Sequence, residues 1–185
     1  MKVHGSDGGA GATIAGDARQ PIVDKAADKA VEKTGTELTH VDGAGKARMV
    51  DVSAKTRVKR TARASGRIDL KPATLELIRQ NGIAKGDVLA TARIAGIMAA
   101  KRTSDIIPLC HNIEIEHVEV ELEADACGIA IRARATCTDK TGIEMEALTA
   151  VSVAALTIYD MCKAVDKTMK IGEILLEEKT KEVLP

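Results

Sequence analysis

Apolar residues recur along this chain with two different periods, which place the expected strands and helices. A strand is expected within 52–70, although its alternation is imperfect. The run 113–123 alternates apolar residues with glutamates apart from a break near His117, which is typical of a half-buried strand with one irregularity. The run 129–137 also alternates, with arginines on its polar side. A turn at 125–128 would join the two runs into a hairpin that sets glutamates opposite arginines.

Three other segments show the three- and four-residue spacing of helices. One covers 73–79 after Pro72, the second covers 88–101, and the third and strongest covers 148–165. The apolar face of the third is expected to carry Leu148, Val151, Ala155, Ile158, Cys162 and Val165. A last strand is expected over 169–177.

The order is therefore strand, two helices, two strands, helix and strand. It predicts an α+β fold, a ferredoxin-like antiparallel sheet with helices packed on one face. A Gly/Ala-rich opening precedes this pattern, with a weak helical stripe over 21–33. We expect a flexible N-terminal extension over 1–37 and a single domain over 38–185.

Composition narrows the function. Basic and acidic residues number 27 each, so excess positive charge does not favour binding to nucleic acid. One Tyr and no Phe or Trp leave no stacking platforms for single strands, and they favour close packing of helices over an aromatic core. No apolar run approaches membrane-spanning length, and the four cysteines lack C-x-x-C spacing. We expect a cytoplasmic protein with neither nucleic-acid nor membrane partners.

A pair of charged residues lies near the end of the strongest helix. The face opposite its apolar residues is expected to hold Glu146, Asp160 and Lys163. Asp160 and Lys163 are three residues apart and so neighbour each other on a helix, a spacing that an ordinary solvated ion pair explains well. A carboxylate raises the pKa of a neighbouring lysine, which suits Lys163 as an acid or a phosphate ligand.

Two further places carry polar groups at element ends. Cys110 and His111 lie in a helix-to-strand junction, but adjacent side chains point apart and no third ligand has suitable spacing, so a substrate hydrogen bond from His111 is favoured over a metal site. Lys85 precedes an expected helix start, where unpaired N–H groups attract phosphate. Lys101, near that helix's end, would equally complement its dipole. Together these groups suit an anionic small molecule without naming a reaction.

Eight short motifs carry a more specific signal. They are LTHV at 38–41, MVDVS at 49–53, KGDV at 85–88, ATARIAG at 90–96, AKRT at 100–103, DIIPLCH at 105–111, KTGIEMEALT at 140–149 and AALTIYDMCK at 154–163. In this order, over about 38–179, the chain resembles the cyclic pyranopterin monophosphate synthase family of molybdenum cofactor biosynthesis.

The resemblance implies a lyase that converts a cyclised dihydro-GTP into cyclic pyranopterin monophosphate and pyrophosphate. It implies a ferredoxin-like subunit in a homohexamer, a trimer of dimers, with active sites at subunit interfaces. No cofactor and no protein-bound metal is implied, although Mg²⁺ could accompany the triphosphate.

Site residues follow from the resemblance position by position. It implies catalytic roles for Lys163 as general acid or base, for Asp160 beside it, and for Lys85. The substrate-binding residues that it implies are Leu109, Cys110, His111, Met145, Glu146, Glu144, Lys101, Arg60 and Lys179. The segment between Gly172 and Lys179 departs from the family's Pro-bearing pattern, which leaves the role of Lys179 open. Also open is whether nearby lysines lower the pKa of Lys163 more than Asp160 raises it.

Three rival interpretations remain. A nucleotide-sensing module without chemistry would need the basic groups but not Asp160, Lys163 and His111 together. A single-strand nucleic-acid binder on the same fold conflicts with the missing aromatics and the glutamates of 113–123. A family member that has lost catalysis would keep the same motifs.

Overall fold

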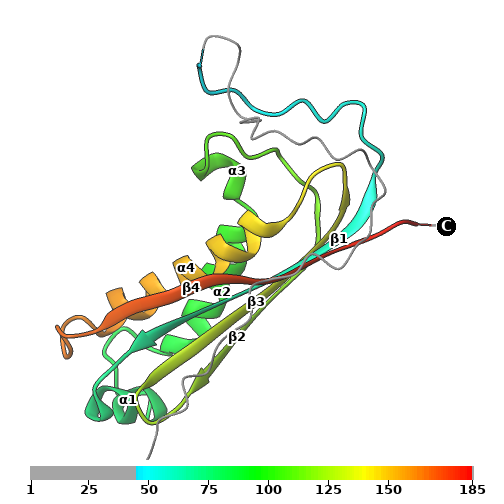
Figure 1. The fold of residues 1–185 in the computed structure, drawn as a ribbon. Helices are drawn as coiled ribbons and strands as arrows, with labels where there is room; N and C mark the ends of the chain where they lie inside the picture. The colour runs from blue at the N-terminus through cyan, green and yellow to red at the C-terminus, as the bar shows by residue number, and fades with distance from the viewer. Residues whose placement is uncertain (1–44, 185) are drawn as a thin grey trace, which may run out of the picture.

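The computed structural model describes residues 45–184, drawn in colour in Figure 1. In chain order the elements are β1 (Val58–Asp69), α1 (Pro72–Arg79), α2 (Val88–Ala100), α3 (Thr103–Ile106), β2 (Ile115–Ala124), β3 (Gly128–Asp139), α4 (Glu144–Cys162) and β4 (Lys170–Glu182). The expected extension over 1–37 and its helical stripe lie outside the described residues, so that domain boundary stays a prediction.

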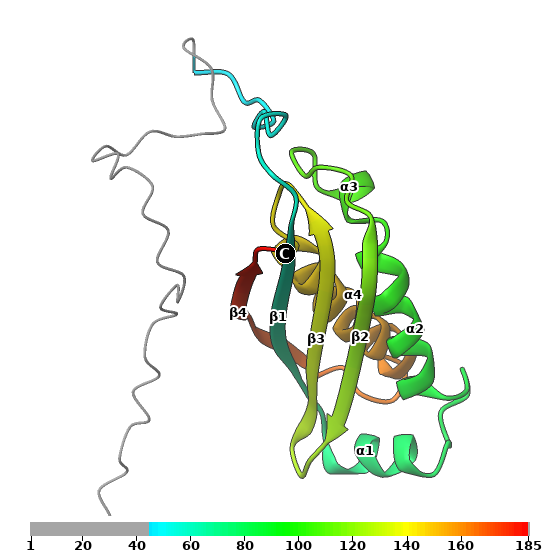
Figure 2. The same ribbon diagram turned by 90° about the vertical axis from the view of Figure 1, so that its right-hand side faces the viewer.

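The four strands form one antiparallel sheet in the order β2-β3-β1-β4. Figure 2 shows the four strands side by side in this order. The strand order and the βαββαβ succession confirm the predicted ferredoxin-like α+β fold. The β2–β3 hairpin sets Glu119 opposite Arg134 and Glu121 opposite Arg132. Its register shifts before His117, which confirms the expected irregularity.

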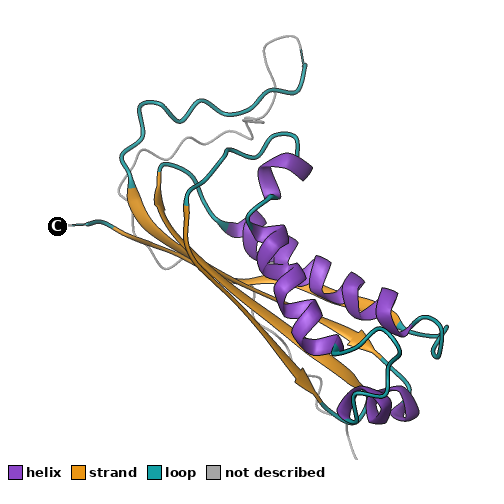
Figure 3. Ribbon diagram, turned by 180° about the vertical axis from the view of Figure 1, so that it is seen from behind, coloured by secondary structure: helices purple, strands orange, loops and turns teal. Residues whose placement is uncertain are grey.

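The long helices α2 and α4 cover one face of the sheet, as Figure 3 shows. The core lies between these layers and is built from Ala, Ile, Val, Leu, Met and Cys side chains. Gly96 of α2 faces Ala150 of α4, and a Cβ on Gly96 would lie 2.9 Å from the Ala150 carbonyl oxygen. The bare glycine therefore lets the two helices approach closely, which fits a core that has no large aromatic rings.

Several expected boundaries differ from the structure. The strand expected within 52–70 begins only at Val58. Helix α4 ends at Cys162, whose carbonyl accepts the N–H groups of Val165 and Asp166, so the chain turns there. Val165, expected on the apolar face, lies beyond the helix with 53% of its surface exposed, and that prediction is wrong.

Strand β4 continues to Glu182 rather than ending at 177. Among the described strands it lies at the edge of the sheet and pairs only with β1, and its second half is exposed. Side chains there have no core to face, so they leave no hydrophobic alternation in the sequence.

Among residues 45–184, helix α4 is long and apolar enough to cross a membrane by length and composition alone. This corrects the expectation that no apolar run approaches that length. Its apolar stretch has a mean hydropathy of 1.3, but 56% of it is buried inside the fold. An apolar helix covered on most sides is typical of a domain core.

Candidate functional site

Three charged side chains meet at the C-terminal end of α4, and we call Lys85, Asp160 and Lys163 the charged trio. Lys163 Nζ lies 2.6 Å from Asp160 Oδ1, and Lys85 Nζ lies 2.6 Å from Asp160 Oδ2. Lys85 Nζ also donates to the Asp160 backbone carbonyl at 3.0 Å. All three side chains are about half exposed, at 51–58%. The structure thus brings the three residues with implied catalytic roles into direct contact.

Local structure explains why Lys85 reaches α4. It lies just before α2, which runs antiparallel to α4, so the start of α2 is next to the end of α4. Gly86 has a φ of +94°, which lets the chain turn directly after Lys85. Asp87 caps α2 by accepting from the Ala90 N–H at 2.9 Å. A carboxylate therefore already occupies the helix start at which Lys85 was expected to bind phosphate.

The trio sets its own protonation states. Hydrogen bonds from Lys163 and then Lys85 lower the pKa of Asp160 to about 2. The hydrogen bond and charge of Asp160 raise the pKa of Lys163 above its usual range. Within the described chain, the effect of Asp160 therefore exceeds any lowering by nearby lysines. Lys163 is protonated at neutral pH and can donate a proton or bind an anion.

A second group of predicted residues lies around the start of α4 and lines a cavity of about 330 Å³, which we call the loop cavity. It is lined by Val50, Val52, Lys55, Leu109, Cys110, His111, Ile113, Thr141, Gly142, Glu144, Met145 and Glu146. Most of the predicted substrate-binding residues are among these. Sequence reasoning did not assign Val50 and Val52 to the site, although the MVDVS motif contains both.

His111 and Cys110 do not act as a pair. His111 Nε2 lies 2.8 Å from the Val50 carbonyl oxygen, which can only accept, so Nε2 carries the hydrogen. Burial and the charge of Glu146 raise the pKa of Cys110, which keeps its thiol neutral. Over residues 45–184, no group of three His, Cys, Asp or Glu residues is arranged to hold a metal ion.

Glu146 differs from expectation. Sequence spacing placed it on the exposed face with Asp160, but only 3% of its surface is exposed and its Oε2 has no partner among the described residues. The two residues do share a side of α4, but the loop residues that line the cavity lie only over the N-terminal end of that side. Burial, with the charge of Glu144, raises the pKa of Glu146 to about 7.

The remaining basic residues differ in their surroundings. Arg60 donates to the carbonyls of Asp139 and Lys140, at 3.0 and 3.2 Å, and so holds the connection between β3 and α4. Lys179 Nζ lies 3.8 Å from Glu144 Oε1, beside the loop cavity. Lys101 is the exposed residue that follows the C-terminal end of α2, which lies beside the start of α4. Positive charge therefore gathers near the loop cavity as well as in the trio.

The two clusters stand at opposite ends of α4. Glu146 and Asp160 are fourteen residues apart on one continuous helix, which is about 21 Å along its axis at a rise of about 1.5 Å per residue. The predicted site residues therefore form two separate clusters in the described chain.

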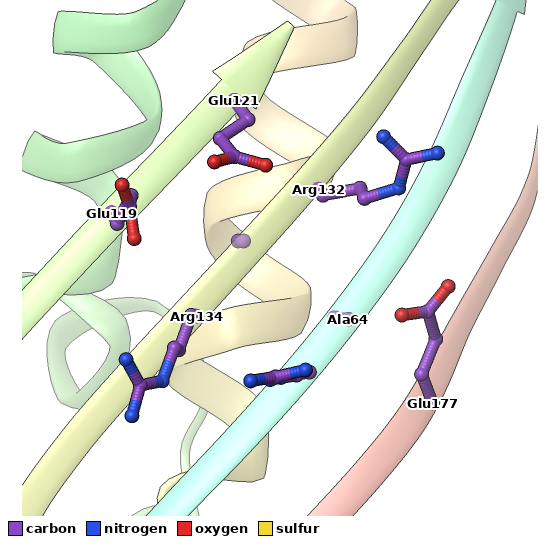
Figure 4. Close-up of a pocket in the computed structure, with 8 residues that line it drawn as sticks. Ala64, Glu119, Glu121, Arg132, Arg134 and Glu177 are labelled. Atoms are coloured by element: carbon purple, nitrogen blue, oxygen red, sulfur yellow. The ribbon is translucent and has the colours of Figure 1, made fainter.

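A different hollow, of about 300 Å³, lies on the face of the sheet opposite α2 and α4. Figure 4 shows Arg132 and Arg134 beside Glu119 and Glu121, with Glu177 on the far strand. Opposite charges alternate across it, and none of the predicted site residues lines it. Its charges balance one another, which does not favour an anionic ligand.

Comparison with known proteins adds independent information. The model described as the MoaC family matches residues 49–182. The cyclic pyranopterin monophosphate synthase of Chloroflexus aggregans is 59% identical over 142 residues, covering 76% of this chain and 86% of that protein.

Proteins of the same description in Streptomyces avermitilis and Desulfitobacterium hafniense are also 59% identical. They match over 143 and 145 residues, covering 77% and 78% of this chain and 84% and 89% of those proteins. Both clusters lie inside the residues matched by the family model.

Proposed function

The chain belongs to the MoaC family, and on that premise we propose that it is a cyclic pyranopterin monophosphate synthase, a lyase of molybdenum cofactor biosynthesis. Its substrate is a GTP-derived small molecule, the cyclised dihydro-GTP, and pyrophosphate is the second product. The observation that carries the proposal is the charged trio. Sequence identity with the relatives would be weaker support for an enzyme if the three residues with implied catalytic roles were not in contact.

The chemistry of the trio suits this reaction. Loss of pyrophosphate builds up negative charge on phosphate oxygens, and the side chains of Lys85 and Lys163, paired with one carboxylate, are already in place to stabilise that charge. Lys163, held protonated by Asp160, donates a proton during the rearrangement. Asp160 keeps its negative charge and forms ion pairs with both lysines.

We extend the proposal to a homohexamer, a trimer of dimers, in which each active site combines the trio of one chain with the loop cavity of another. On this proposal the trio and the loop cavity are each a half-site. The distance along α4 supports this, since neither half-site is complete alone. Exposed apolar side chains on the outer side of the helix layer also support it, with Ile94 of α2 and Leu156 of α4 each 57% exposed. A two-fold pairing of antiparallel α4 helices sets the end of each beside the start of the other.

The proposal includes no protein-held cofactor. Since no group of three His, Cys, Asp or Glu residues within 45–184 is arranged to hold a metal ion, we propose that any Mg²⁺ is bound through the triphosphate itself. We also place the protein in the cytoplasm without nucleic-acid or membrane partners. The balanced charge and the scattered cysteines support this assignment.

Pyrophosphate release from the cyclised dihydro-GTP tests the function. The wild-type protein is expected to release pyrophosphate with a pterin product, and Lys163→Ala is expected to lose this activity while keeping its oligomeric state. Lys170→Ala is the matched control, because it removes an exposed lysine at the start of β4, outside both half-sites. Binding of the compound without release would favour a sensing role, and near-normal turnover by Lys163→Ala would remove that residue from the mechanism.

A further inference from the structure

A second aspartate lies three residues beyond Lys163, and its surroundings are opposite to those of Asp160. Asp166 is fully buried, with 0% of its surface exposed. Aspartate is rarely fully buried unless it is paired, because loss of hydration must be replaced by hydrogen bonds. Nothing in the proposed chemistry uses this carboxylate directly, so its burial requires another explanation.

Four hydrogen bonds hold the Asp166 carboxylate. Oδ2 accepts from the Lys71 backbone N–H at 2.9 Å and from Thr74 Oγ1 at 3.1 Å. Oδ1 accepts from the Thr168 N–H at 2.9 Å and its Oγ1 at 2.8 Å. The Lys71 ammonium lies further away, 3.9 Å from Oδ1. Both acceptor oxygens are therefore fully engaged.

These bonds tie together three parts of the chain. Helix α1 begins after Lys71, which makes no capping hydrogen bond of its own, and the first turn of α1 has no acidic residue. The carboxylate of Asp166 comes from 95 residues further along the chain, binds the N–H of the N-cap residue Lys71 and the Thr74 hydroxyl, and so places a negative charge at the start of the helix. Through Thr168 it also fixes the path from α4 towards β4.

The same region carries the charged trio. The Asp166 N–H bonds to the Cys162 carbonyl at 3.0 Å, so Lys163 lies inside a turn that Asp166 closes. On the other side, α1 leads into the short connection that carries Lys85. The end of α4 and the segment 71–86 are thus linked twice, by exposed Asp160 and by buried Asp166.

The two links differ in strength. Ion pairs between half-exposed groups, as in the trio, contribute little to holding a geometry. A buried carboxylate with every oxygen engaged resists displacement, because moving it breaks four hydrogen bonds and leaves the buried Thr74 hydroxyl without this acceptor.

We propose that Asp166 is a positioning residue for the reaction, whose buried carboxylate keeps Lys163 and Asp160 aligned with Lys85. The expected effect on kcat rests on the proposed function. The alignment of Lys163, Asp160 and Lys85 by Asp166 does not depend on it. A shift of the turn by about 1 Å would separate the ammonium groups from the substrate and would cost about 100-fold in rate.

The experiment compares Asp166→Asn, Thr74→Val and Thr74→Ser in steady-state pyrophosphate release, corrected for folded protein. Asp166→Asn is expected to lower kcat by about 100-fold while KM changes by less than about threefold. Thr74→Val removes one donor to Asp166 without touching α4, and we expect a smaller loss of kcat. Thr74→Ser keeps the hydroxyl and is expected to restore kcat to near the wild-type value.

A core variant separates positioning from general destabilisation. Ile131→Val lies in the buried part of β3, away from the trio, and is expected to lower Tm without changing kcat per folded molecule. If Asp166→Asn folds and keeps kcat within twofold of the wild type, the proposal is wrong. If Asp166→Asn does not fold, the Thr74 pair decides, and equal kcat values for its Val and Ser variants overturn the proposal.

An NMR titration of the Lys163 ammonium tests the geometry without turnover. Asp160 raises the pKa of Lys163 in the wild type, so a loosened pair is expected to return that midpoint towards the usual lysine value in Asp166→Asn and Thr74→Val. An unchanged midpoint in both variants contradicts the inference. Wild-type protein that releases no pyrophosphate would overturn the proposed function, and this titration would still decide the role of Asp166.

Discussion

Two inactive variants of this chain are expected to regain activity when they are mixed. Lys163→Ala alters the charged trio, and His111→Ala alters the loop cavity at the other end of α4. If each active site takes its trio from one chain and its cavity from another, neither variant alone has an intact site. A mixed pair has one site in which both residues are altered and one site in which both are wild type.

The size of the recovery follows from the half-site geometry. Random exchange of equal amounts makes half of the pairs mixed, and each mixed pair has one intact site out of two. We therefore expect about one quarter of the wild-type activity, from two proteins that each have almost none. A site contained within one chain predicts no recovery, and the separation of about 21 Å along α4 is what argues against that arrangement.

The assay is pyrophosphate release after the two variants are expressed together or refolded together. A mixture of Lys163→Ala with Lys85→Ala is the matched control, because both changes fall in the trio and every site in a mixed pair then lacks one lysine. Recovery in the first mixture and not in the second is the expected result. Equal results in the two mixtures, with or without recovery, would refute a site shared between chains.

Three further predictions concern stability and assembly. Burial raises the pKa of Glu146 to about 7, so its ionised form destabilises the fold as pH rises from about 4.5 through 7. Glu146→Gln is therefore expected to stabilise the protein in urea unfolding by up to about 3 kcal/mol at pH 8 and by little at pH 5. Equal effects at both pH values would contradict this. Gly96→Ala places a Cβ 2.9 Å from the Ala150 carbonyl oxygen and is expected to cost about 1–3 kcal/mol, seen as a lower Tm in calorimetry; an unchanged Tm would show that the two helices can separate freely. Leu156→Glu places a charge on the outer side of α4 and is expected to dissociate the oligomer in analytical ultracentrifugation and to abolish turnover. An intact oligomer would show that this surface is not the interface.

The parts of the fold that depend on local periodicity were predictable from the sequence. The alternation in β2 and β3 and its break near His117 follow from a sheet with one covered face. The spacing of Asp160 and Lys163 likewise predicted their contact, because three residues bring side chains together on any helix.

Features that depend on tertiary packing could not be predicted in this way. Lys85 meets Asp160 only because α2 packs antiparallel to α4, and 75 residues separate the two in the chain. Glu146 shares a side of its helix with Asp160, but a distant loop covers one and leaves the other in water. Hydrophobic periodicity gives the direction of a side chain along a helix and says nothing about what covers it.

The unbroken length of α4 restricts how this protein can change. The helix has 19 residues, and its first and last turns serve different reaction centres in the proposed pair. Inserting one residue in its middle would rotate one end by about 100° and move it by about 1.5 Å relative to the other. In a two-fold pair this error would occur in both centres at once. Insertions and deletions should therefore be tolerated in the surface loops long before they are tolerated in this helix.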